Sequence, residues 1–149
     1  GIREYTVTPG EKTTTISGKG KAGLKQEENY YFFYLPVCYK GITGKSYAYY
    51  NTSRSKNLYL PASVDENYSY DIQLPENLTL CTPIQEKKID NPIGSFKITL
   101  TSEGSSLHIE LALQIKKQLI TPAEYPAFRS LITEWTDRTR KPILFKTVQ

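Results

Sequence analysis

The chain has 149 residues, which fits one domain with a buried core. Its net charge is only +4 and its Lys and Arg residues are scattered, so the composition argues against nucleic-acid binding. No apolar run approaches the roughly 18 residues that a membrane-spanning helix needs, and no segment reads as a signal peptide. The chain opens on Gly1 and contains no methionine, from which we expect a processed product or a piece of a longer chain.

The first 27 residues are predicted to form strands followed by a flexible loop. Residues 4–8 favour an edge strand that ends at a Pro-Gly pair, and the Thr-rich run 12–17 is expected to pair with it. Residues 18–23 are rich in Gly and Lys, which is typical of a mobile loop. They lack the Gly-Lys-Ser/Thr of a phosphate-binding loop, and no helix pattern follows them. We treat residues 1–27 as part of the domain or a flank of it, and residues 28–149 as the domain.

Short strands dominate the middle of the chain. Residues 30–37 are the most aromatic segment and have apolar side chains on both faces, which favours a strand covered on both sides. The strongest alternation lies at 107–115, where five aliphatic residues share one face, and 96–101 alternates in the same way. The polar link 102–106 contains one glycine, so we expect an antiparallel hairpin. Shorter strands are expected at 46–51, 58–60, 68–74, 78–80, 87–90 and 143–146.

The period changes once, near the C-terminus. Thr121, Pro122 and Glu124 form a capping-box pattern, with Thr at the N-cap and Pro at the first helical position. The apolar residues that follow recur at helical spacing, namely Tyr125, Phe128, Leu131, Ile132 and Trp135. These patterns predict a mostly-β domain, an antiparallel two-sheet β-sandwich of Greek-key-like type. It carries one C-terminal amphipathic helix over about 121–139, whose apolar stripe is expected to pack on the sheet or to cap one end of it.

A thiol hydrolase or a zinc site would depend on Cys38, Cys81 and His108. The histidine lies on the polar face of its strand, and neither cysteine lies at a helix N-terminus that would stabilise a thiolate. One His and two Cys show no zinc-ligand spacing. We therefore expect no catalytic residue, no metal and no cofactor. The two cysteines are either buried free thiols or a disulfide that closes a loop of about 40 residues, and both alternatives stay open.

The carboxylates occur singly apart from the adjacent Glu27 and Glu28, and the spacing that paired acids need in space does not follow from sequence. Surface placement is the favoured interpretation for all of them, and Glu110 on its strand and Glu134 on the helix are the strongest candidates for partial burial.

Ten of the 12 tyrosines lie between residues 30 and 70. One interpretation is ordinary strand packing with half-buried rings. The other is a flat aromatic platform on which sugars stack. The tyrosines that would carry the second interpretation are Tyr47, Tyr49, Tyr50 and Tyr59.

The C-terminal motifs resemble those of a known family. A long alternating strand to Lys117, the run 119–128 (Leu-Ile-Thr-Pro-Ala-Glu-Tyr-Pro-Ala-Phe) and the run 142–146 (Pro-Ile-Leu-Phe-Lys) resemble the C-terminal domain of unknown function of bacterial transglutaminase-like proteins. Residues 74–78 are similar to that family's mid-domain strand ending in Leu-Pro. The likeness runs from about Tyr30 to the end. In that family the domain follows an N-terminal β domain and a papain-like transglutaminase core.

The resemblance implies a β-sandwich in an extracytoplasmic setting, periplasmic or at the cell surface. It also implies that the Cys-His-Asp machinery lies in another part of the parent, so no catalytic residue is assigned to this chain. We expect a non-catalytic accessory or interaction domain that docks on the transglutaminase- or peptidase-like core of the same polypeptide, or presents substrate to it. The alternative is a carbohydrate-binding β-sandwich module that uses the tyrosines of residues 30–70. The expected partners are that core and a protein or glycan ligand, without nucleic acid.

Overall fold

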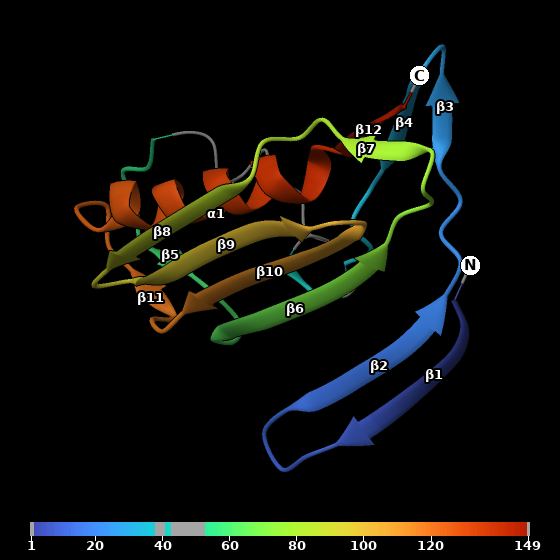
Figure 1. Ribbon diagram of the computed structural model, residues 1–149. Helices are drawn as coiled ribbons and strands as arrows, with labels where there is room; N and C mark the ends of the chain where they lie inside the picture. The colour runs from blue at the N-terminus through green and yellow to red at the C-terminus, as the bar shows by residue number, and fades with distance from the viewer. Residues whose placement is uncertain (1, 38–40, 43–52, 149) are drawn as a thin grey trace.

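The computed structural model describes residues 2–37, 41–42 and 53–148. Its strands form antiparallel sheets, and its helix lies near the C-terminus (Figure 1), so the predicted mostly-β class is confirmed. The main sheet consists, in spatial order, of β6 (Val64–Gln73), β10 (Ser106–Ile115), β9 (Gly94–Glu103) and β8 (Gln85–Asn91). The second sheet consists of β3 (Lys25–Glu27), β4 (Tyr30–Phe33), β12 (Ile143–Thr147) and β7 (Leu78–Leu80). Two smaller pairs are β1 (Ile2–Pro9) with β2 (Thr14–Gly20), and β11 (Leu119–Ile120) with β5 (Leu58–Tyr59).

The predicted hairpin is confirmed as β9–β10, the centre of the main sheet. Ile109 faces Leu100 and Leu113 faces Phe96, so the aliphatic rows of both strands point to the same side. The turn is shorter than the predicted polar link, because the strands extend to Glu103 and Ser106. Gly104 has a φ of 58°, a left-handed conformation that glycine adopts without steric cost.

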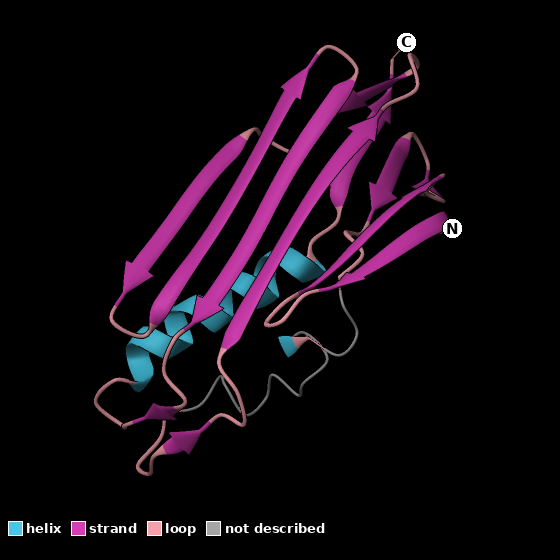
Figure 2. Ribbon diagram, turned by 90° about the horizontal axis from the view of Figure 1, so that it is seen from below, coloured by secondary structure: helices cyan, strands magenta, loops and turns pink. Residues whose placement is uncertain are grey.

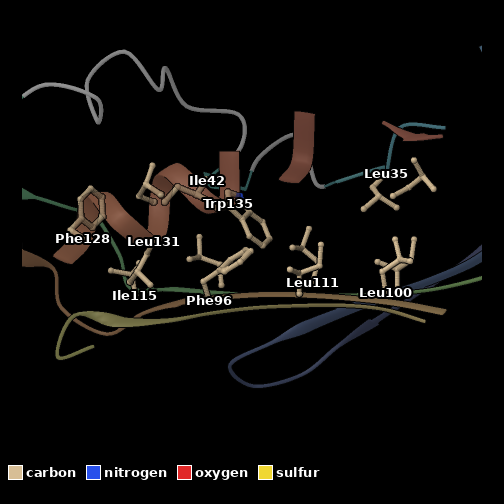
Figure 3. Packing of buried hydrophobic residues seen from close by; sticks show 14 of the residues in the cluster. Leu35, Ile42, Phe96, Leu100, Leu111, Ile115, Phe128, Leu131 and Trp135 are labelled. Carbon is tan, nitrogen blue, oxygen red and sulfur yellow. The ribbon is translucent and has the colours of Figure 1, made fainter. Parts of the chain in front are cut away.

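Helix α1 (Tyr125–Arg140) lies across one face of the main sheet, as Figures 1 and 2 show. Figure 3 shows Phe128, Leu131 and Trp135 above the sheet residues, which include Phe96 and Ile115. The layer continues beyond the helix, where Leu35 lies over Leu100 (Figure 3). Leu78, Ile143 and Phe145 of the second sheet belong to the same buried cluster. This two-layer core is consistent with the predicted sandwich.

The helix begins later than predicted, at Tyr125, and its N-cap is Glu124 rather than Thr121. Pro126 gives the reason. In a helix capped at Thr121 it would occupy an interior position, where its missing N–H could not bond to the carbonyl of Pro122. With the observed start it lies in the first turn, where proline is tolerated.

The predictions for the first 51 residues need correction or completion at several places. Strand β2 runs through Gly18 to Gly20, a stretch predicted to be mobile, because these residues pair with β1. Strand β3 pairs with β4, so residues 25–27 join the second sheet. The aromatic strand predicted at 30–37 ends at Phe33. The strand predicted at 46–51 falls outside the described residues.

Candidate functional site

The face of the main sheet that points away from α1 is uncovered and polar, and Figure 2 looks onto it. Successive strand residues point to opposite faces, so its side chains come from the positions between the core residues. The register sets His108 of β10 opposite Asp71 of β6 and Thr101 of β9. Glu110 lies two positions further along the same face. The fold thus brings together polar groups that are far apart in the sequence.

These groups form a connected ionic network. Asp71 Oδ1 lies 2.7 Å from His108 Nδ1, and Glu110 Oε1 lies 3.7 Å from His108 Nε2. Lys97 Nζ donates to Glu110 Oε2 over 2.8 Å. The hydrogen bond to Asp71 raises the pKa of His108, and the bond from Lys97 lowers the pKa of Glu110. Because the groups are exposed to water, each pair adds little to stability.

A shallow pocket of about 310 Å³ lies beside this network. Ser106, His108 and Asp71 all line it, which is the residue set of a serine hydrolase. However, the Ser106 hydroxyl donates to Gln73 Oε1 over 3.0 Å, while His108 Nε2 faces Glu110. The serine is therefore not bonded to the histidine that would take its proton. The pocket offers hydrogen-bonding and ionic groups for recognition rather than an activated nucleophile.

A second hollow of about 510 Å³ lies at the start of α1. Ile89, Pro126 and Tyr125 give it an apolar lining, and Arg54 and Arg129 bring positive charge. The Arg54 guanidinium lies 5.9 Å from the centre of the Tyr125 ring. The carboxylate of Glu134 also lines the hollow, which therefore carries charges of both signs beside an apolar surface.

The structure does not bring Cys81 to His108. Cys81 is a half-buried free thiol beyond β7, and its Sγ lies 4.0 Å from the Thr79 carbonyl oxygen in the second sheet. Cys38 falls outside the described residues. No three His, Cys, Asp or Glu side chains are grouped as metal ligands in the part of the chain that the structure describes. No helix there is long and apolar enough to cross a membrane.

Of the two carboxylates considered for partial burial, Glu134 has a side-chain exposure of 21%, whereas Glu110 is 46% exposed on the open face. The sequence interpretation missed Glu66, which lies on the core-facing side of β6. Its carboxylate accepts hydrogen bonds from the Tyr68 hydroxyl, at 2.9 Å, and from the backbone N–H of Ile42. The sequence contains a signal for this placement: Glu66 is separated by two and four residues from Tyr68 and Tyr70, so it shares a strand face with these aromatic residues.

The tyrosines of residues 30–70 divide between packing and exposure. Tyr68 and Tyr70 point inward, and the Tyr70 hydroxyl donates to the Pro36 carbonyl oxygen over 2.6 Å. Burial raises the pKa of Tyr70. Tyr59 on β5 is 69% exposed. Three of the tyrosines proposed for sugar stacking fall outside the described residues, namely Tyr47, Tyr49 and Tyr50.

Comparison with known proteins places most of this chain in one group. The family model described as a domain of unknown function with a solved structure, DUF3858, matches residues 29–145. A crystal structure described as a "putative protease" from Parabacteroides distasonis is similar, with a TM-score of 0.68 and 30% sequence identity. The similarity covers 82% of this chain and 24% of that chain, so this chain spans about a quarter of the solved one. No curated protein matches.

Proposed function

The chain belongs to the DUF3858 family of domains of unknown function, and from this membership we propose that it is a non-catalytic accessory domain of a larger transglutaminase- or peptidase-like protein. It docks on the catalytic core of the same polypeptide or presents substrate to that core. The observation that carries the proposal is the 30% identity to one quarter of a much longer chain described as a protease. That fraction is the size of one domain within a larger protein.

The described side chains support a binding role rather than a catalytic one. The groups with hydrolase chemistry are held in other contacts: His108 by Asp71 and Glu110, and Ser106 by Gln73. Cys81 lies just beyond β7 of the other four-stranded sheet. By contrast, the polar face of the main sheet and the hollow at the start of α1 are open and carry charges of both signs. Such surfaces suit recognition of another polypeptide.

The transglutaminase-like context and an extracytoplasmic setting are parts of the same proposal. Both rest on the motifs around residues 119–128 and 142–146. Fractionation of cells that carry the tagged full-length parent tests the setting, since the proposal expects the protein outside the cytoplasm.

The accessory role is tested by comparing the parent polypeptide with and without this domain. We expect removal to lower the melting temperature of the catalytic part or its turnover of a protein substrate more than its turnover of a small chromogenic one. The isolated domain should turn over neither substrate. A His108→Ala variant of the whole parent should keep its turnover of the small chromogenic substrate, because no catalytic group is assigned to this domain. Turnover by the isolated domain, or an unchanged catalytic part after removal, would overturn the proposal.

A glycan-binding module is the second candidate, and the exposed ring of Tyr59 favours it. A glycan array probed with the chain and with Tyr59→Ala separates the two. Glycan binding that Tyr59→Ala abolishes would support the module. A substitution of Tyr70, which points inward, is the control and should leave glycan binding unchanged.

A further inference from the structure

The β1–β2 hairpin has one apolar face and one polar face. In its register Val7 faces Ile16 and Tyr5 faces Gly18, and facing residues of an antiparallel pair share a side. Tyr5, Val7 and Ile16 therefore form one apolar surface. The opposite side carries Glu4, Thr6, Thr8, Thr15, Ser17 and Lys19.

This apolar surface takes no part in the buried core of the described residues. Tyr5, Val7 and Ile16 are 71%, 47% and 64% exposed, and none belongs to the buried cluster or its partly buried neighbours. The hairpin lies to the side of β6 in Figures 1 and 2 and forms a sheet of its own. An isolated two-stranded ribbon is marginally stable in water, and such alternation is typical of strands that bury one side.

We propose that the apolar face of this hairpin, formed by Tyr5, Val7 and Ile16, docks on the catalytic part of the larger polypeptide to which the domain belongs. The inference rests on the proposed function. Two findings identify the occupant. The similar solved chain is about four times longer than the part this chain covers. In addition, the family match begins at residue 29, after the hairpin. The ribbon thus lies outside the residues that the family model matches, and its apolar residues take no part in the buried cluster of the described residues, so they are available to a neighbouring part of the polypeptide.

Hydrogen exchange on the full-length parent tests the docking. The informative variant is Val7→Lys/Ile16→Lys, which places two charges on the apolar face. The matched control is Thr6→Lys/Ser17→Lys. It places two facing lysines at the neighbouring pair of positions, on the polar face. Both variants set two lysines opposite each other, so both introduce one facing pair of like charges into the ribbon.

We expect the amides of β1 and β2 to be protected in the wild-type parent. The apolar-face variant should speed their exchange by about tenfold or more, and the polar-face control should leave it nearly unchanged. Unprotected amides in the wild-type parent, or equal effects of the two variants, would overturn the inference. Protection that rises with protein concentration would assign the face to a second copy of the chain, which also overturns it.

The outcomes separate this inference from the accessory role. If the hairpin amides are unprotected but removal of the domain still weakens the catalytic part, only the hairpin docking fails. If removal of the domain changes nothing, the accessory role fails as well.

Discussion

The rings of Trp135 and Tyr68 lie 5.9 Å apart, centre to centre, and join α1 to the edge strand β6. Trp135 is fully buried (Figure 3), and its indole N–H has no acceptor among the described residues. Its contribution therefore comes from packing. We expect Trp135→Ala to lower the free energy of unfolding by about 3–5 kcal/mol, because it leaves a cavity between helix and sheet. Urea unfolding followed by circular dichroism measures this. Trp135→Phe keeps an aromatic ring and breaks no hydrogen bond, so it should cost clearly less, and an equal loss would contradict the packing account.

Gly94 at the start of β9 faces Ile115, and its backbone lies close to that of β10. A Cβ at this position would lie 1.8 Å from the Gln114 carbonyl oxygen, a backbone atom that cannot turn aside. We expect Gly94→Ala to destabilise the domain by about 1–3 kcal/mol or more in thermal or urea unfolding. The control is Gly23→Ala, where a Cβ meets nothing within 4 Å. Equal stabilities of the two variants would refute the close approach.

His108 is the only histidine, so its titration can be followed without overlap by NMR. We expect its pKa to lie above the ordinary value of 6.5, because the bond to Asp71 favours the charged ring. Asp71→Asn should lower the pKa, and Asp90→Asn, on the other edge strand, should leave it unchanged. A pKa that Asp71→Asn does not move would contradict the ion pair.

The same pair predicts how stability varies with pH. The folded state holds the proton on His108 more tightly than the unfolded state does. The stabilisation is therefore complete below the ordinary pKa and is lost as pH rises through the higher folded value. The melting temperature of the wild type relative to Asp71→Asn should fall over that interval. A difference that grows with rising pH would have the wrong sign.

Glu124 accepts hydrogen bonds from Lys117 and from the backbone N–H and hydroxyl of Thr121. These donors lower its pKa from 4.5 to about 2. The stabilisation they give is present above pH 4.5 and is lost as pH falls toward 2. We expect the melting-temperature gap between wild type and Glu124→Gln to close over this range. A constant gap would show that the carboxylate charge does not matter.

The core was predictable from sequence where one period held over a long segment. The aliphatic row of 107–115 and the helical stripe from Tyr125 to Trp135 both turned out buried. The helix start was not predicted correctly, because the capping pattern at Thr121 was weighed without the constraint that Pro126 imposes. Local propensity also missed β2 beyond Ser17, since pairing with β1 extends a strand through glycines.

The polar site could not be predicted, because it depends on registers between distant strands. The contact of His108 with Asp71 requires β6 to pair with β10, and a shift of one residue would move Asp71 to the core side. The network of Lys97 and Glu110 likewise needs the β9–β10 register. The residue types of the outer face follow from the alternation along each strand, but their partners on neighbouring strands do not.

The proposed function and the proposed role of the β1–β2 hairpin both predict that this domain docks on the catalytic part of its own polypeptide. The most direct measurement is an NMR titration of the 149-residue chain with the catalytic part produced separately. Because a short linker supplies an effective concentration of about 1 mM, a docked domain needs a dissociation constant below about that value. We expect saturable one-to-one shifts that include the amides of β1 and β2. Unshifted spectra at about 1 mM of the catalytic part would contradict the claim.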